Sequence, residues 1–223
     1  MIKIEHTVFP SPDQMEFIIE GMRNPMNSWD NSDSIIIPGG FDGELEKFDL
    51  GENDERLMLK LAKSGSDHRK YMRMIQVYVR ITAPLYWWKE FDTYKVGTVS
   101  NSCSTMHKIT DKEFVVDDFS CEHLMSSGME NLLQTIKVLN NYRDAYIHYW
   151  DNNRFVELDK KDIWYQIIQL LPSSYNQTRN ITLNYEVLSN IYISRKYHKL
   201  DEWRNFCKWI ETIPMSELIM ETV

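Results

Sequence analysis

The spacing of apolar residues predicts several helices and a few strands in this chain. Residues 72–84 alternate between two faces, are rich in β-branched side chains and end at Pro84, which is typical of a strand. Residues 126–150 carry apolar side chains at helical spacing, which predicts a long amphipathic helix. Further helices are predicted over 157–171, 185–195 and 200–213, and a polar, strand-like segment precedes the second of these.

The N-terminal part predicts a smaller set of elements. Residues 2–9 alternate like a short strand, and Ser11 is a suitable N-cap for a helix with Pro12 in its first turn. Residues 24–44 contain several Gly and Pro and predict a loop, whereas residues 54–63 predict a helix that ends before a glycine. No internal repeat and no clear linker interrupts the chain, so we expect one α+β domain.

The net charge of the chain limits the kinds of nucleic-acid ligand that it can bind. The sequence has 25 Lys and Arg against 33 Asp and Glu, a formal net charge of −8. A protein that binds a nucleic-acid polymer needs clustered cations to replace the counterions of the phosphates, and the sequence has no such cluster. One or two local cations are enough to hold the phosphate of a single nucleotide, so a small nucleotide is compatible with this charge.

Other sequence features predict the compartment. The three cysteines form no Cys-x-x-Cys pair, and their odd number argues against a disulfide framework. The N-terminus lacks the basic and apolar regions of a signal peptide, and polar residues interrupt the longest apolar run, 72–88. We therefore expect a soluble, reduced, cytoplasmic protein that does not span a membrane.

The common catalytic motifs are absent. The sequence has no Gly-x-Gly-x-x-Gly, no phosphate-binding loop and no Gly-x-Ser-x-Gly. No two histidines lie at the spacing of metal ligands on a helix, and Cys103 with His107 falls in a segment that is a poor helix former. The sequence therefore predicts no metal site, and motifs alone indicate no particular reaction.

Three segments follow one another in a recognisable order: LAKSGSDH (61–68), VYVRITAPLYWWKEF (77–91) and DTYKVGTVSNSCST (92–105). Their order resembles the flavin-dependent thymidylate synthases, the ThyX family. In that family a helix ending in Lys-x-Gly leads to a loop with a histidine, then to a strand ending in Ala-Pro and an aromatic helical turn. The motif Arg-His-Arg-x-x-Ser-x-Asn-Glu-x-Ser-x-Arg follows and holds the flavin and the nucleotide.

The C-terminal half extends this resemblance. A Leu-Pro pair that ends at Pro172 is followed by Asn184, Asn190 and Arg195 at the family's spacing, without a gap. The resemblance covers residues 50–210 and rests on order and spacing, because no single motif is intact.

The resemblance implies a fold and an activity. The fold would be a single α+β domain over residues 1–223, with a mixed β-sheet flanked by long α-helices. The family assembles as homotetramers whose sites are shared between subunits, and the tyrosines of the long helix suit such interfaces: Tyr142, Tyr146 and Tyr149. Family members methylate dUMP to dTMP with FAD as cofactor, methylenetetrahydrofolate as carbon donor and NADPH as reductant, so we expect the same here.

The resemblance also assigns site residues. Arg195 would bind the nucleotide, and further nucleotide contacts would come from Cys103, Asn101 and Glu90. The cofactor would be held by a second set: Asn184, Asn190, Lys95, Tyr94, Thr93 and His68. No catalytic residue is assigned, because the flavin carries the chemistry in this family and Cys103 is expected only to line the pocket.

Several of these residues also have structural interpretations. Arg195 lies at the end of a predicted helix, where cations are favoured, and Asn184 lies at the start of the same helix, where asparagine is a good N-cap. His68 follows a polar turn, and we favour a surface position for it. Asn190 is in the middle of a helix, where asparagine is unfavourable, so we expect a polar role.

The family motif is heavily altered in this chain. On an ungapped alignment, uncharged residues replace three arginines and a histidine: Thr93, Thr105, Ile168 and Tyr94. Arginine binds phosphate through a bidentate fork that other side chains lack, so a phosphate site would have to be rebuilt. Two alternatives therefore stay open: a relative that acts on another pyrimidine nucleotide, and a nucleotide-binding, flavin-binding or structural protein without catalysis.

Overall fold

The computed structural model describes residues 2–40, 45–149 and 159–221. Its larger sheet is built from four strands: β1 (Lys3–Val8), β4 (Gln76–Pro84), β5 (Val99–Ser102) and β6 (Asn176–Asn184). Their order in the sheet is β1-β4-β6-β5. The register of the central pair is marked by Arg80 Nε, which donates to Asn180 Oδ1 over 3.2 Å, and by the hydroxyls of Thr82 and Thr178, 2.7 Å apart.

The α+β class is confirmed, but this sheet is antiparallel where a mixed sheet was expected. The alternation of residues along β4 is clear, with Val77, Val79 and Ile81 buried and the intervening side chains more exposed. That alternation is the same whether a strand pairs with a parallel or an antiparallel neighbour. The pattern could therefore identify the strands but not the direction of their pairing.

The described residues group into two compact units, and each is discontinuous in sequence. The first unit takes its described residues from 1–3, 82–92 and 102–179. The second takes them from 4–81, 93–101 and 180–223. The single domain expected over 1–223 stays a prediction, and positions 1, 41–44, 150–158 and 222–223 of that range lie outside the described residues.

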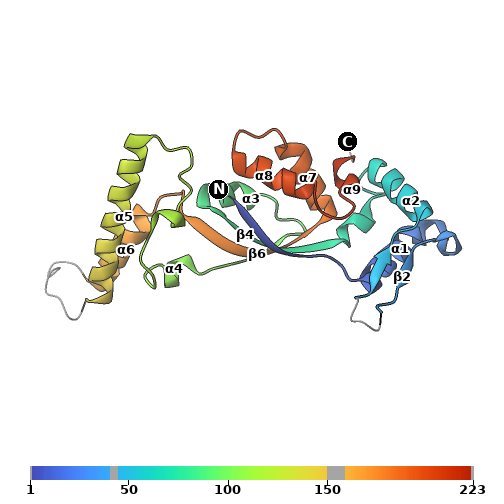
Figure 1. The fold of residues 1–223 in the computed structure, drawn as a ribbon, viewed down its shortest axis with the longest axis horizontal. Coiled ribbons are helices and arrows are strands. Elements are labelled where there is room, and N and C mark those ends of the chain that lie inside the picture. Colours follow the sequence, from blue (N-terminus) through green and yellow to red (C-terminus); the bar gives the residue numbers. More distant parts are fainter. Residues whose placement is uncertain (1, 41–44, 150–158, 222–223) are drawn as a thin grey trace. The chain divides into compact units, whose positions relative to one another are not determined.

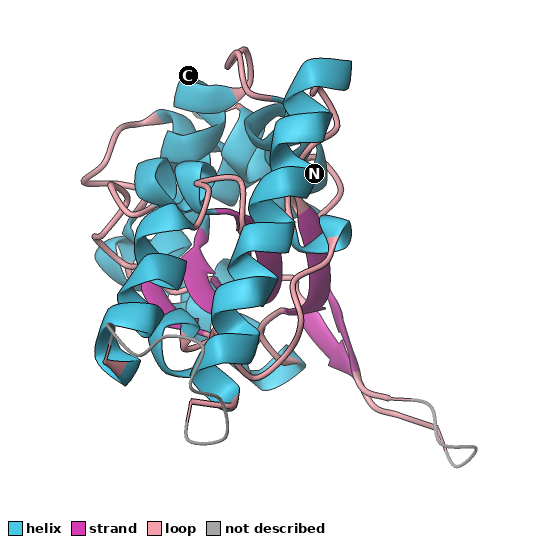
Figure 2. Ribbon diagram, turned by 90° about the vertical axis from the view of Figure 1, so that its left-hand side faces the viewer, coloured by secondary structure: helices cyan, strands magenta, loops and turns pink. Residues whose placement is uncertain are grey.

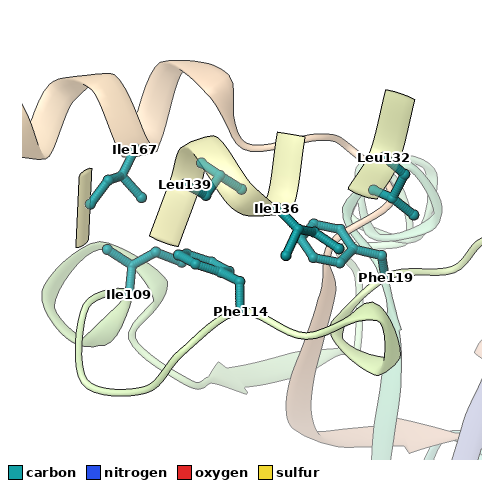
Figure 3. Packing of buried hydrophobic residues seen from close by; sticks show 7 residues of the cluster. All are labelled: Ile109, Phe114, Phe119, Leu132, Ile136, Leu139 and Ile167. Carbon is teal, nitrogen blue, oxygen red and sulfur yellow. The ribbon is translucent and has the colours of Figure 1, made fainter. Parts of the chain in front are cut away.

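The first unit is built around a pair of helices. Helices α5 (Ser126–Ile147) and α6 (Lys160–Leu170) pack side by side (Figure 1). Their apolar faces form one core with the segment between β5 and α5 (Figure 3), and its members are Ile109, Phe114, Phe119, Leu132, Ile136, Leu139 and Ile167. Both helices were predicted, although part of the predicted range, 157–158, lies outside the described residues.

The first unit also contains the aromatic turn that follows Pro84. Helix α3 (Leu85–Phe91) buries Trp87, Trp88 and Phe91, and the two indole rings meet edge to face with centroids 4.8 Å apart. Two short elements complete the unit: α4 (Thr105–Lys108) and a 3-10 turn at Val116–Asp118. The tryptophan pair therefore belongs to the buried core.

The second unit begins with a capped helix that the sequence predicted correctly. Ser11 precedes α1 (Pro12–Arg23); its hydroxyl accepts from the backbone of Gln14, and the side chain of Gln14 accepts from the backbone of Ser11. This reciprocal capping box satisfies two of the otherwise unpaired N–H groups at the start of the helix. The apolar face of the helix is buried: Met15, Ile18, Ile19 and Met22.

The loop predicted over 24–44 is wrong in part. Its residues Ile35–Ile37 form strand β2, which pairs antiparallel with β3 (Lys47–Asp49) as a short ribbon (Figure 2). The fully buried carboxylate of Asp54 fixes the segment before this ribbon by accepting hydrogen bonds from Ser32, Ser34 and Arg23. Local composition could not reveal this, because the carboxylate lies about twenty residues further along the chain.

The remaining elements of the second unit are mostly helical. Helices α7 (Tyr185–Arg195) and α8 (Asp201–Ile210) were predicted within a few residues, and α8 buries Trp203, Phe206 and Cys207. The others are α2 (Glu52–Lys63), α9 (Glu217–Met220) and 3-10 turns at Asn24–Met26, Trp29–Asn31 and Lys70–Arg73. Within the described ranges, no helix combines the length and the apolar composition that crossing a membrane requires.

Candidate functional site

Strand β6 continues into α7 without a connecting loop, and Asn184 makes this junction. Asn184 is the last residue of the strand and the N-cap of the helix, and its Oδ1 accepts from the backbone nitrogen of Val187 over 3.0 Å. The side chain is buried. The side-chain oxygen of Asn184 is therefore the helix cap, as the structural interpretation of this residue expected. Its amide nitrogen is directed toward Gly97, in the loop between α3 and β5.

Arg195 is the last residue of the same helix, and its guanidinium is held by aromatic side chains. Its Nε donates to Tyr94 Oη over 2.9 Å. The guanidinium carbon lies 5.7 Å from the ring centroid of Tyr94 and 4.9 Å from that of Trp203, which is fully buried. Arg195 and Tyr94, two of the residues assigned from sequence, are thus brought together, and Trp203 was missed.

The segment of residues 93–101, which comprises the loop after α3 and the start of β5, carries two more of the residues expected to bind the cofactor, Thr93 and Lys95. Thr93 and Lys95 are exposed, whereas Thr98 Oγ1 is buried and has no hydrogen-bond partner among the residues that the structure describes. A buried hydroxyl without a partner is costly, so such an atom commonly meets a ligand or water. Asn101, on strand β5, borders a cavity of about 260 Å³ on the sheet together with Tyr78.

Two of the expected residues lie on the surface. His68 is exposed, and its backbone nitrogen donates to the carbonyl of Gly65 in a turn, as the surface-loop interpretation expected. Asn190 is exposed on α7, although its position in the middle of the helix had suggested a polar role. The structure brings neither of them to Tyr94 and Arg195 through a hydrogen bond in the described chain.

Glu186, in the first turn of α7, was missed by the sequence reasoning. Its carboxylate accepts hydrogen bonds from Arg73 and, over 3.4 Å, from Arg69 Nε. The hydrogen bond from Arg73 outweighs the effect of burial and holds the pKa of Glu186 below its usual value. This ionised group therefore fastens the start of α7 to the 3-10 turn at Lys70–Arg73.

In the first unit, Cys103 borders a large cavity of about 520 Å³. Its backbone nitrogen donates to the carbonyl of Thr178 over 3.0 Å, and its carbonyl accepts from Gln177 Nε2 over 3.3 Å. The same Gln177 nitrogen donates to Thr105 Oγ1 over 2.7 Å. Cys103 is exposed where it borders this cavity.

Two other residues of this unit bear on the candidate site. Glu90 is half-buried on α3. Tyr175 lies at the border of the large cavity, where burial raises the pKa of its hydroxyl. Burial therefore favours the protonated hydroxyl, which can donate a hydrogen bond at this cavity.

Arg179 is the cation of the first unit that sequence reasoning missed. Its Nη1 donates to Asp92 Oδ1 over 2.7 Å, its Nε donates to Gln177 Oε1 over 2.9 Å, and its guanidinium carbon lies 4.2 Å from the ring centroid of Trp88. The alternation along β6 carried the signal, because Gln177 and Arg179 are two residues apart and so share a face. Ile168, which stands where the family has an arginine, packs against the apolar core of this unit.

Comparisons with known proteins identify the fold. A scan against protein-family models and a search of curated proteins found no match. A flavin-dependent thymidylate synthase, ThyX from Helicobacter pylori complexed with FAD and dUMP, matches with a TM-score of 0.60 and 14% identity, over 100% of this chain and 99% of that chain. A second H. pylori ThyX structure with FAD and dUMP gives a TM-score of 0.62 and 14% identity, over 99% and 97%.

A third match is a nucleotide methylase. PolB from Streptomyces cacaoi, a UMP/dUMP methylase bound with 5-Br dUMP, has a TM-score of 0.55 and 12% identity, over 100% of this chain and 97% of that chain. The matches extend the resemblance from residues 50–210 to the whole chain. At these identities they establish the architecture: the chain has the fold of the flavin-dependent thymidylate synthases.

Proposed function

We propose that the protein is a flavin-dependent methylase of a pyrimidine nucleotide, with dUMP as the first candidate substrate and dTMP as its product. The observation that carries the proposal is the contact between Arg195 and Tyr94. Arg195 stands at the family's spacing in the C-terminal half, and Tyr94 stands inside the segment that aligns with the family's flavin and nucleotide motif. A fold shared along the full chain supports the same conclusion.

The residues of the 93–101 segment fit a bound flavin in part. Thr98 supplies a buried hydroxyl without a partner in the described chain, and Gly97 lets the backbone approach Asn184 closely. When bound, FAD would carry the methylene group and the hydride, drawn from methylenetetrahydrofolate and NADPH. We assign Thr93, Tyr94, Lys95, Asn184, Asn190 and His68 to the cofactor, and Arg195, Cys103, Asn101 and Glu90 to the nucleotide.

In this proposal the protein binds and orients, and its own side chains make no covalent bond to the substrate. Arg195 offers N–H donors to an oxygen of the nucleotide, and the hydroxyl and amide groups of the 93–101 segment shield and align the ring of the cofactor. The missing arginines weaken phosphate binding, and the compensating cations available nearby in sequence are lysines: Lys89, Lys95 and Lys108. Because lysine lacks the bidentate fork, the compensation is partial and the activity on dUMP is low.

Two other functions are supported by particular observations. The PolB match favours a relative that methylates a different pyrimidine nucleotide, since that protein is described as a UMP/dUMP methylase. Thr93, Thr105 and Ile168 in place of arginines favour a protein that binds a flavin or a nucleotide without catalysis. In all three cases we propose a cytoplasmic protein that assembles as a homotetramer.

The experiment that separates these functions uses the purified full chain. Its absorption spectrum reports a bound flavin, and mass spectrometry of the released small molecules identifies the cofactor and any nucleotide. The protein is then supplied with reduced nicotinamide, methylenetetrahydrofolate and either dUMP or UMP, and the methylated product is measured.

Growth of a thymidine-requiring bacterial strain that carries this gene tests the same activity in cells. Bound flavin with conversion of dUMP supports the first proposal, and bound flavin with conversion of UMP alone supports the second. Bound flavin without turnover of either nucleotide supports a binding protein, and the absence of both flavin and turnover contradicts the flavin-dependent methylase altogether.

A further inference from the structure

Arg195 is restrained by two aromatic side chains that come from outside its own helix. Tyr94, from the loop after α3, accepts the hydrogen bond from Nε, and Trp203, from α8, lies against the guanidinium. Tyr94 and Trp203 also contact one another edge to face, with ring centroids 6.0 Å apart. Fixing an arginine side chain costs conformational entropy, because the side chain loses rotamer freedom. The aromatic contacts already fix Arg195 in the ligand-free protein, so less entropy is lost when a ligand binds.

We propose that Tyr94 is a positioning residue that orients Arg195 toward the nucleotide, an inference that rests on the proposed function. A hydrogen bond at Nε limits rotation about the last bonds of the side chain. The guanidinium has five N–H donors in one plane, and Tyr94 engages one of them, so fixing Nε fixes the direction of the whole plane. An acceptor oxygen of a pyrimidine nucleotide then meets a donor whose direction is already set.

This role differs from the direct cofactor contact that the family motif implies for Tyr94. The motif places a histidine at this position, which would carry positive charge when protonated and repel a neighbouring guanidinium. A tyrosine hydroxyl instead accepts a hydrogen bond from the guanidinium. The centroid of the tyrosine ring lies 5.7 Å from the guanidinium carbon, so the ring adds a cation–π contact. The arrangement also requires arginine at position 195, because lysine has no planar Nε–H donor.

A double-mutant cycle on the full chain tests the inference. Isothermal titration calorimetry with dUMP, and separately with UMP, is carried out on the wild type, Tyr94→Phe, Arg195→Ala and the double variant. We expect Tyr94→Phe to weaken binding about tenfold, the usual size for a hydrogen bond to a charged group, and to have no further effect once Arg195 is alanine.

The matched control is Tyr192→Phe. Tyr192 lies on the same helix, and its hydroxyl donates to Glu211 Oε1 over 2.9 Å, so this variant also removes one tyrosine hydroxyl bond near the end of α7. It should leave nucleotide affinity unchanged. A second, ligand-free measurement follows the Arg195 Nε–H signal by NMR: its exchange with solvent should accelerate in Tyr94→Phe and stay the same in Tyr192→Phe.

Each result has a distinct meaning. An equal loss of affinity from Tyr94→Phe in both backgrounds would show that Tyr94 contacts a ligand directly, and would overturn the positioning role while the proposed function stands. Unchanged affinity, or an unchanged exchange rate at Nε, would overturn it as well. If the wild type binds neither dUMP nor UMP, the proposed function and the positioning role fall together.

Discussion

The amide nitrogen of Asn184 occupies the space where a side chain on Gly97 would begin, so that a Cβ at Gly97 would come within 2.5 Å of it. Gly97 also has a φ of 76°, in the left-handed region that glycine tolerates best. Asn184 cannot simply turn away, because its other side-chain atom, Oδ1, caps α7. The path of the loop between α3 and β5 and the start of α7 therefore depend on one another.

The first prediction concerns this contact. Gly97→Ala should lower the free energy of unfolding by about 1–3 kcal/mol, from the unfavourable φ together with the displacement of the Asn184 amide. Urea unfolding of the purified protein measures the change. Gly65→Ala is the matched control, since Gly65 has a φ of 97° and nothing within 4 Å of an added Cβ. Equal losses in the two variants would show that the contact with Asn184 contributes nothing.

The second prediction concerns the cap itself. Asn184→Ala should destabilise the protein by about 1 kcal/mol, because the backbone nitrogen of Val187 loses its acceptor. Asn184→Asp retains an acceptor at the same place and should lose less. Asn190→Ala, at an exposed position in the middle of the same helix, should not destabilise the protein and should raise the unfolding free energy by at most about 0.7 kcal/mol, because alanine is the better helix former. A loss in Asn190→Ala as large as that in Asn184→Ala would contradict the capping role.

The third prediction concerns pH. The pKa of Glu186 is lowered in the folded protein by its hydrogen bond with Arg73, so the ionised form stabilises the fold. That contribution is fully present above the usual value of about 4.5 and is lost as the pH falls through the lower, folded value. The difference in unfolding free energy between wild type and Glu186→Gln should therefore be largest near neutral pH and shrink below pH 4.5.

Chemical denaturation at a series of pH values measures this difference. Glu16→Gln, at an exposed position of α1, serves as the control for removing a carboxylate. A difference between wild type and Glu186→Gln that stays constant from neutral pH down to pH 3 would contradict the proposed origin of the stabilisation.

The fourth prediction compares two residues assigned to the nucleotide. Arg195→Ala should weaken dUMP binding by roughly ten- to a hundredfold, the range for a lost hydrogen bond from a charged group. Cys103→Ser replaces an exposed thiol by a hydroxyl of similar size and should change the affinity far less. Calorimetry on both variants gives the comparison, and the reverse order would refute the assignment of Arg195.

The fifth prediction concerns assembly. We expect a homotetramer, and α5 leaves Leu133 and Ile147 exposed in the described chain, at 48% and 42%. Tyr142, Tyr146 and Tyr149, suggested for an interface, are half-buried. Multi-angle light scattering at micromolar concentration should give four times the mass of the chain. Leu133→Glu should shift the distribution to smaller species if this face of α5 is used, and a wild-type monomer would contradict the tetramer.

The sequence predicted much of the fold for physical reasons that act locally. Three features depend only on neighbouring residues: the capping box at Ser11, the alternation along β4 and the helical spacing of α5. Each could therefore be predicted without a structure. Strand β2 was not, because the buried carboxylate of Asp54 that fixes the segment before it lies far along the chain. The direction of strand pairing could not be predicted either, because the alternation along a strand is the same for parallel and antiparallel neighbours.

The candidate site likewise contains residues that the sequence identified and residues that it did not. Asn184 and Arg195 were proposed from their spacing, and the helix that joins them has the bounds that the pattern predicted. The restraint of Arg195 by Trp203 could not be read from the sequence, because it requires α8 to return against α7. Arg179 was also missed, although its alternation with Gln177 along β6 was visible, since a single cation in a polar strand has no distinctive pattern.

The direct passage from strand to helix at Asn184 has a consequence for changes in chain length. A loop can absorb an inserted residue, but this junction has none. An extra residue between Asn180 and Asn184 would move the following side chains to the opposite face of the sheet. An extra residue within α7 would rotate everything beyond it by about 100°, given about 3.6 residues per turn, and would carry Arg195 away from Tyr94. The segment from Asn180 to Arg195 can therefore accept substitutions, but not insertions that change its number of residues.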